Sequence, residues 1–326
     1  DFICSLYDAE GQLLTAGMGV LQHMMPASEA VSHIIDTFDE EYINPGDMFM
    51  ENDPYSAAMH APDMYLIQPI FRDDELVAWS SSFVHIPDIG SIDIGGFSDR
   101  STEVYHDGFQ TPGLKLVDGI EVRPDVMDTL RHMSRLPDLA EMDMRSQIAA
   151  NNVAKERLHD IMDEYGSETV LDVGQQLVDE SENKFRKKLR ELPDGTWQSR
   201  QYVDSDPEDK LYTVDLELRK EGDTLTFDYS GTSDQAEIGL NCTQVASYGG
   251  TAVVLLPLLA EDITWNEGLL EAIEVKAPDG TIVNCNEPAT PNTATITTIQ
   301  TCNQVATIAT SKMLVSDERY RDRATA

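Results

Sequence analysis

The chain has 326 residues, of which 41% are hydrophobic, so it can bury the core of one large or two ordinary domains. Asp and Glu number 59 against 23 Lys and Arg, which gives a formal net charge of -36. Because phosphate binding depends on clustered Lys and Arg, this charge excludes a nucleic-acid partner and attachment to an anionic membrane surface.

Carboxylates recur at positions typical of a solvent-exposed surface, as in residues 36–41 and 204–209. Self-repulsion of this size works against a compact chain, and molar salt reduces it by shortening the Debye length to about 3 Å. The composition therefore predicts a halophilic protein from a salt-rich cytoplasm. The alternative is an ordinary acidic cytosolic protein, and a cytoplasmic location is expected in both cases.

Four cysteines are scattered along the chain without a Cys-x-x-Cys pair, so neither a zinc knuckle nor a disulfide scaffold is indicated. They are expected to be reduced core residues. The longest apolar run, residues 252–260, is far shorter than the ~20 residues that span a bilayer, and no transmembrane segment is predicted. The chain begins without Met inside a strand-like alternation, so we expect a fragment whose start is missing.

Strands and turns dominate the first predicted region, residues 1–122. A helix is expected after Pro26, with Ser28 as its N-cap and residues 44–46 as its end. The other elements expected here are a hairpin over 1–22 with its turn at 9–12, strands over 64–71 and 76–85 joined by a turn at 72–75, and a glycine-rich loop over 90–96.

Helical spacing of apolar residues replaces this pattern after Pro124. The spacing predicts helices that begin near residues 124, 139 and 167 and form a helical section over residues 123–193. The elements expected in the last region, residues 194–326, are strands over 197–203, 211–218 and 224–229 and buried helices over 242–260 and 294–315. The sequence therefore predicts a mixed α+β fold with N-terminal β-hairpins, a helical middle section and a C-terminal β-rich part.

Histidine and aspartate recur at the open end of the predicted hairpin over residues 64–85. Catalytic metal sites typically combine three imidazole or carboxylate ligands and leave other positions open. With the two strands paired symmetrically about their turn, Asp63 is expected opposite Val84, and Pro62 opposite His85. The end of the hairpin would then collect three metal ligands, namely His60, Asp63 and His85.

The same residues have an ordinary structural interpretation, because Asp and His beside Pro usually form caps and turns. Asp53 and Asp88 each lie beside a Pro or a glycine-bearing turn. They are expected either to orient the imidazoles as outer carboxylates or to serve as Asx-turn residues. The residues alone leave both interpretations open.

Several short motifs follow one another along nearly the whole chain. They are Asn52-Asp53-Pro54-Tyr55 with His60 and Asp63, His85 with residues 88–90, and the segments 102–108, 134–137, 143–150, 192–195, 228–233 and 239–241. Together they resemble the hydantoinase B/5-oxoprolinase and acetone carboxylase alpha-subunit family. The second glycine of the family's Asp-Ile-Gly-Gly is Ser91 here, so substrate contacts in that loop are expected to differ. Family chains also extend beyond Ala326.

The resemblance implies one subunit of an ATP-dependent enzyme complex that activates a stable carbonyl compound. Family members include hydrolases that open hydantoin or oxoproline rings and carboxylases of acetone and acetophenone. The resemblance implies a buried divalent metal at His60, Asp63 and His85, with manganese favoured in the carboxylase branch and zinc or iron as alternatives. ATP is expected on a separate hydantoinase A-like subunit in a heterotetramer or larger assembly, since this sequence has no Gly-x-x-x-x-Gly-Lys-Ser/Thr loop.

The resemblance also implies roles for six further residues. His23 matches a family histidine and is expected either to contact substrate or transfer a proton, or to be a satisfied histidine before a helix. Asp88 and Glu103 are the other predicted catalytic residues; Glu103, like His106, is expected either to orient ligands or to be a strand-edge polar group without a chemical role. The predicted substrate-binding residues are Asn52, Asp53 and His106.

Three classes of function remain open. The first, which we prefer, is ATP-dependent ring opening of a cyclic amide, in which phosphorylation turns the carbonyl oxygen into a leaving group and a metal activates water. The second is ketone carboxylation, favoured by the segments 134–137, 194–197 and 311–314, which resemble the carboxylase branch. The third is a non-catalytic scaffold subunit whose histidines are structural.

Overall fold

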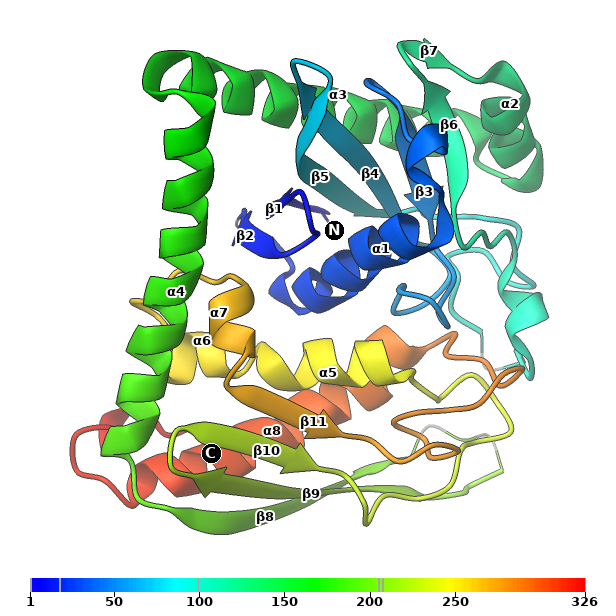
Figure 1. Ribbon diagram of the computed structural model, residues 1–326. Helices are drawn as coiled ribbons and strands as arrows, with labels where there is room; N and C mark the ends of the chain where they lie inside the picture. The colour runs from blue at the N-terminus through cyan, green and yellow to red at the C-terminus, as the bar shows by residue number, and fades with distance from the viewer. Residues whose placement is uncertain (1, 18, 99, 205, 207, 326) are drawn as a thin grey trace. The chain divides into compact units, whose positions relative to one another are not determined.

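The computed structural model of the protein describes residues 2–17, 19–98, 100–204, 206 and 208–325. The chain divides into two compact units, one of residues 1–98 and 105–176 and the other of residues 99–104 and 177–326. Each unit contains a β-sheet with helices packed against it (Figure 1). The predicted mixed α+β class is therefore confirmed.

Within the described residues, the first unit is built on a seven-stranded antiparallel sheet with the strand order β2-β1-β5-β4-β3-β6-β7. Its strands are β1 (Phe2–Asp8), β2 (Leu13–Ala16), β3 (Met48–Glu51), β4 (Asp63–Arg72), β5 (Glu75–His85), β6 (Leu114–Asp118) and β7 (Glu121–Val122). The long central pair β4 and β5 is the predicted hairpin; β4 is one residue longer at each end, and β5 begins one residue earlier and ends at His85 as predicted.

The turn of this hairpin lies at Asp73 and Asp74, as predicted. Their φ values of 51° and 65° are both positive, which is the conformation of the two central residues of a type I′ turn. Such a turn matches the right-handed twist of its flanking strands. The two strands therefore leave the turn already aligned for pairing.

A β-bulge then interrupts the pairing close to the turn. Phe71 pairs with Leu76, but Ile70 pairs with Ala78, which leaves Val77 as an extra residue on β5. Every pair beyond the bulge is therefore shifted by one residue from a symmetrical hairpin. The sequence did not predict this shift, because the extra residue, Val77, is apolar and does not interrupt the strand-like pattern of β5.

The shift corrects the predicted pairing at the open end of the hairpin. Asp63 does not face Val84, and Pro62 does not face His85; instead, Asp63 pairs directly with His85. Side chains of directly opposed residues lie on the same face of a sheet. The bulge therefore brings two of the three predicted ligands closer together than the symmetrical hairpin would.

Helices pack against both faces of the central strands. Helix α1 (Met24–Thr37) covers the face that carries Asp63, since His23, immediately before it, contacts Tyr65. Helix α3 (Pro137–Tyr165) covers the opposite face, where Met64 and Met144 share a hydrophobic core. Both faces of β4 and β5 are thus shielded from solvent.

Helix α1 begins earlier than predicted. It starts at Met24, so Pro26 lies in its first turn, where a missing N–H removes no helical hydrogen bond. Ser28 is therefore not the N-cap: its hydroxyl donates to the Met24 carbonyl at 3.2 Å from inside the helix. His23, immediately before the helix, lies over the central strands β4 and β5, where it contacts Tyr65 and Phe83.

The predicted helices of the middle section are present. They are α2 (Pro124–Met133), α3 and α4 (Ser167–Glu191), with Pro124 and Pro137 each at the first turn of its helix. From α3, the Gln147 amide donates to two strand carbonyls, those of Met64 and Ser82, at 2.9 Å each. This side chain fastens α3 to both strands of the hairpin next to Asp63.

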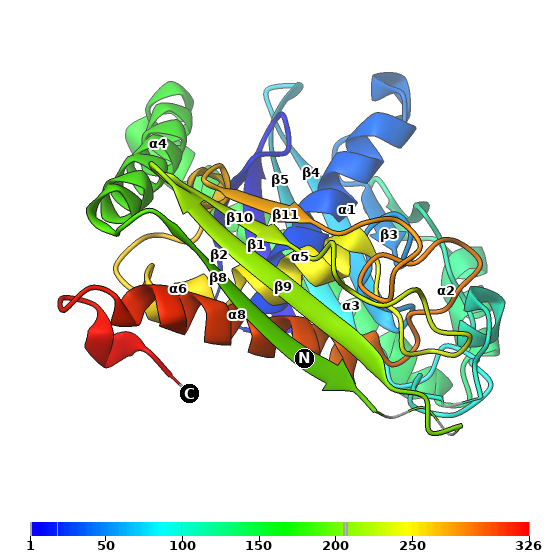
Figure 2. The same cartoon turned by 90° about the horizontal axis from the view of Figure 1, so that it is seen from below.

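The second unit contains a four-stranded sheet with the order β11-β10-β9-β8, in which only the β10–β11 pair is parallel. Its described elements are β8 (Gly195–Val203), β9 (Tyr212–Glu221), β10 (Thr224–Asp228), β11 (Ile273–Lys276), α5 (Gln244–Ala252), α6 (Leu255–Leu258), α7 (Glu267–Leu270) and α8 (Thr298–Val315). Helix α8 packs along β8 and β9 (Figure 2). The predicted strands and buried helices are confirmed, with a break between α5 and α6.

The cysteines and the apolar segments also agree with the sequence. All four cysteines are free; the three buried ones are Cys242, Cys285 and Cys302, while Cys4 is half-buried. Burial raises the pKa of the Cys4 thiol to about 11. Among the described helices, none has the length and apolar character needed to cross a membrane.

The acidic composition leads to a prediction about salt. Because screening weakens repulsion among the 59 carboxylates, we expect the melting temperature to rise steadily as KCl increases from about 0.1 to 3 M. Thermal scans by circular dichroism measure it, and sucrose is the control that strengthens burial without screening charge. A melting temperature that stays level in KCl would contradict a halophilic origin.

Candidate metal centre

The hairpin and the segment before it bring the three predicted metal ligands together in the first unit. Asp63 is the first residue of β4 and His85 the last residue of β5. His60 lies one turn before Asp63, and its carbonyl accepts a hydrogen bond from the Asp63 N–H at 2.9 Å. The predicted convergence of His60, Asp63 and His85 is present, and within the described residues it is the cluster whose geometry suits a metal ion.

The three donor atoms form a nearly equilateral triangle. His60 Nε2 lies 3.1 Å from His85 Nδ1, and Asp63 Oδ1 lies 3.2 Å from each of these nitrogens. Ligands bound about 2.1 Å from one ion are about 3.0 Å apart in octahedral and about 3.4 Å apart in tetrahedral geometry. The observed separations fall within this interval.

Hydrogen bonds alone cannot account for all three of these contacts. Each imidazole nitrogen carries at most one hydrogen, and the ionised carboxylate carries none, so at least one of the three contacts has no proton between its atoms. If both nitrogens are protonated, their N–H groups face each other. The second carboxylate oxygen, Asp63 Oδ2, is buried without a hydrogen-bond partner among the described residues. The donor set therefore fits a divalent cation better than a hydrogen-bonded cluster.

The charges around Asp63 favour its ionised form. Burial by itself would raise the pKa of this carboxyl, but the imidazoles of His60 and His23 together hold the pKa well below its usual range. Ligand binding to a cation requires this deprotonated state. Asp63 is thus a ready anionic ligand at neutral pH.

His23 lies on the other side of Asp63. Its Nδ1 is 3.7 Å from Asp63 Oδ2 and 3.1 Å from the Tyr65 hydroxyl, and its ring stacks on Phe83 with centroids 3.9 Å apart. Burial lowers the pKa of His23 to about 4 against the attraction of the Asp63 carboxylate. The predicted substrate-contact or proton-transfer role of His23 stays a prediction.

Asn52 and Asp53, predicted to bind substrate, have their described hydrogen bonds within the chain. The Asn52 amide donates to the carbonyls of Ala61 at 2.6 Å and Phe109 at 2.8 Å, and its oxygen accepts from the Thr111 N–H. Asp53 accepts the N–H of Tyr55 at 2.9 Å, which is an Asx turn. Asn52 thus fastens the segment that carries His60 and Asp63.

Replacing Asn52 by Asp tests this bracing role. A carboxylate keeps the acceptor for Thr111 but cannot donate, so two buried carbonyls lose their partner. We expect Asn52→Asp to lower the free energy of unfolding by about 3 kcal/mol in a urea titration. Asn286→Asp, at an exposed position, is the control and should change little. Unchanged stability in Asn52→Asp with a raised KM would support substrate binding instead.

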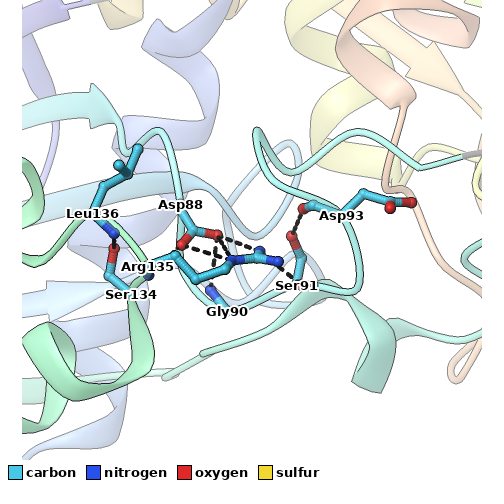
Figure 3. A network of polar contacts seen from close by, with 7 residues as sticks. All are labelled: Asp88, Gly90, Ser91, Asp93, Ser134, Arg135 and Leu136. Carbon is cyan, nitrogen blue, oxygen red and sulfur yellow. Dashed lines mark hydrogen bonds and ion pairs between the residues drawn. The ribbon is translucent and has the colours of Figure 1, made fainter.

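Asp88 is brought together with Arg135 (Figure 3). Its buried carboxylate accepts hydrogen bonds from Arg135 and from the Gly90 N–H, and these contacts hold its pKa below the usual range although burial opposes this. His106 is half-buried in a short 3-10 segment, and its carbonyl accepts the Ile92 N–H at 3.0 Å. Glu103 belongs to the second unit. Their predicted chemical roles stay untested.

Sequence reasoning gave no role to two residues beside the centre. Glu51, the last residue of β3, is fully buried and pairs with Tyr65 of β4. One Glu51 oxygen accepts from the Asp53 N–H at 2.8 Å and the Ser56 hydroxyl at 2.6 Å, and burial raises the pKa of this carboxyl to about 8. The sequence feature that could have identified Glu51 is its position directly after the apolar run Met48–Met50, which is unusual for an acidic residue.

Phe97 was also missed, and it covers the imidazoles. Its ring stacks on His60 with centroids 5.2 Å apart and on His85 with centroids 5.7 Å apart. The side chain of His85 is 20% exposed, whereas that of His60 is 1% exposed. Access to the donor triangle is therefore from the side of His85.

Comparisons with known proteins place the chain in a family. The family model for hydantoinase B/oxoprolinase matches residues 1–320. The B subunit of a putative D-/L-hydantoinase from Pseudomonas sp. strain NS671 is 31% identical over 312 residues, which cover 89% of this chain and 52% of that protein. The chain spans about half the length of the curated relatives it matches.

Solved structures agree with this match. The ATP-dependent caprolactamase from Pseudomonas jessenii superposes with a TM-score of 0.90 at 25% identity, over 96% of this chain and 54% of that one. Acetone carboxylase in its nucleotide-free structure gives a TM-score of 0.88 at 20% identity, over 100% of this chain and 45% of that one, which shows the shared fold. The chain belongs to the hydantoinase B/oxoprolinase family.

Proposed function

We propose that this chain is the B-type subunit of an ATP-dependent enzyme that opens a cyclic amide ring at a divalent metal ion held by His60, Asp63 and His85. The observation that carries the proposal is the triangle of donor atoms 3.1 to 3.2 Å apart, with a buried, ionised carboxylate at one corner. A D-/L-hydantoinase chain and an ATP-dependent caprolactamase among the relatives support the substrate class.

Two imidazoles and one carboxylate suit manganese, iron or zinc, which accept mixed nitrogen and oxygen ligands. When bound, such an ion polarises a carbonyl oxygen or lowers the pKa of a water molecule toward neutrality. In this proposal His60 and His85 bind as neutral imidazoles, and Asp63 supplies the negative charge. Phe97 and the buried hairpin keep bulk water away from the donors.

A stable amide needs activation before water can open it. ATP supplies this in the proposal, because phosphorylating the carbonyl oxygen makes the carbonyl carbon electrophilic. Water adds to that carbon, the ring C–N bond breaks with the proton going to the leaving nitrogen, and hydrolysis of the resulting acyl phosphate releases inorganic phosphate. A hydantoinase A-like partner subunit would bind the ATP, in a cytoplasmic heterotetramer or larger assembly. His23, whose Nδ1 lies 3.7 Å from Asp63 Oδ2, would be the residue that accepts a proton from the attacking water.

The native complex decides between this reaction and its alternatives. The complex is purified with its partner chains and assayed with ATP in two ways. In the first assay the substrate is a cyclic amide, with hydantoin, oxoproline and caprolactam tested separately. In the second assay the substrates are acetone and labelled bicarbonate. Ring opening with ADP release is the expected result. Label fixed into acid-stable product without ring opening would favour ketone carboxylation, which the fold shared with acetone carboxylase supports. Full activity in a complex carrying His85→Ala would favour a non-catalytic scaffold.

A further inference from the structure

The segment Ser134-Arg135-Leu136-Pro137 has no role in the proposed chemistry, yet it takes part in a network of polar contacts with the loop that begins at Asp88 (Figure 3). Arg135 Nε lies 3.1 Å from both oxygens of Asp88, and its Nη2 and its backbone N–H also donate to that carboxylate. The Asp88 side chain is fully buried. This paired, charge-assisted arrangement is rigid and specific to arginine.

The contacts continue from Arg135 along the following loop. Its Nη2 donates to the Ser91 carbonyl at 2.8 Å. The Ser91 hydroxyl then donates to the Asp93 carbonyl, and the Ser98 hydroxyl to the Asp93 carboxylate, each at 2.5 Å. Residues 88–98, defined here as the Arg135 loop, are therefore braced from their first residue to their last.

The far end of the Arg135 loop rests on the metal-ligand segment. Gly96 has a φ of 69°, and a Cβ there would lie 2.2 Å from Pro62 Cγ, so only glycine permits this approach. The next residue, Phe97, stacks on both candidate ligands, with interplanar angles of 29° to His60 and 12° to His85. Two neighbouring residues thus contact the site independently.

We propose that Phe97 fixes the ring planes of His60 and His85 for metal binding, and that Arg135 positions Phe97 through the braced loop. The direction of an imidazole lone pair follows its ring plane, so a ring free to rotate cannot keep three donors converged on one ion. Phe97 and Arg135 are positioning residues in this inference, which rests on the proposed metal site. The competing interpretation is that the Arg135–Asp88 pair only stabilises the fold.

Binding of Co²⁺ to the purified chain tests the inference. Phe97→Leu removes the flat ring while staying apolar, and Arg135→Lys keeps the charge but loses the paired donors. We expect each to weaken Co²⁺ affinity about 10- to 100-fold and to change the visible absorption of bound Co²⁺. Arg145→Lys, the same change at an exposed ion pair with Glu141, is the matched control and should match the wild type. Wild-type affinity and spectrum in Phe97→Leu would overturn the inference.

A second measurement does not depend on the metal. In the metal-free chain, Arg135→Lys and Asp88→Asn should speed amide hydrogen exchange in residues 88–98 while α3 exchanges as in the wild type. Unchanged exchange in the Arg135 loop would overturn the role of Arg135. Failure of the wild type to bind Co²⁺, or wild-type binding by His60→Ala, would contradict the proposed function instead, and the exchange result would then decide on the loop alone.

Discussion

Replacing His85 by alanine is expected to remove the bound metal while the chain stays folded. The substitution removes one of the three donor atoms. An ion held by the remaining two, from His60 and Asp63, would exchange more readily with water. We expect affinity for the ion to fall by at least about 100-fold, which is more than the loss typical when a residue that only contacts the ligands is replaced. Elemental analysis after dialysis measures the stoichiometry, and circular dichroism reports the fold.

His132→Ala is the matched control, because His132 is an exposed histidine near the end of α2. It should keep the wild-type metal content. His60→Ala should behave as His85→Ala does, although its buried position makes some loss of stability expected as well. Stoichiometric metal in both His60→Ala and His85→Ala would show that the ion binds elsewhere.

Glu51→Gln is expected to make the chain more stable than the wild type at alkaline pH. Burial raises the pKa of Glu51 from 4.5 to about 8. Because the folded value is the higher one, the protonated carboxyl contributes its full stability below pH 4.5, and this contribution is lost as the pH rises through 8. Across that window, the wild type should lose about 1.4 kcal/mol per pH unit relative to Glu51→Gln.

Urea titrations of the metal-free proteins at several pH values measure this difference. Glutamine keeps the oxygen that accepts from Asp53 and Ser56, so the turn after β3 should persist. Glu10→Gln, at an exposed turn, is the control and should show no such trend. A stability difference that stays constant between pH 5 and pH 8 would mean that Glu51 ionises normally in the fold.

The sequence predicted the elements of the hairpin and the convergence of His60, Asp63 and His85 at its open end. Alternating apolar residues defined β4 and β5, and two adjacent aspartates marked the turn. The predicted register of β4 against β5 differs from the observed one by one residue, because Val77 forms a bulge that no local pattern reveals. In the predicted register Asp63 and His85 would lie on opposite faces of the hairpin, so their close approach depends on the bulge, which makes them a directly opposed pair on one face.

Contacts between distant segments could not be predicted. Phe97 lies in a glycine-rich loop without periodicity, and nothing in its neighbours indicates that it stacks on two imidazoles. The partner of Asp88 is Arg135, 47 residues away, on the junction between two helices. Burial of Glu51 depends on the pairing of β3 with β4. Each of these depends on tertiary packing, for which single-sequence propensities carry no information.

The bulge at Val77 also sets where this hairpin can change in length. It lies seven pairs from Asp63, roughly 23 Å along the strand. Removing Val77 would leave Phe71 opposite Leu76 and Ile70 opposite Ala78, so the ligands would still meet. Removing one residue between Ala78 and Val84 would instead bring Ile86, which cannot ligate a metal, opposite Asp63. A design that transfers this centre to another scaffold can therefore delete Val77 near the turn, but it cannot delete a residue of β5 between Ala78 and Val84.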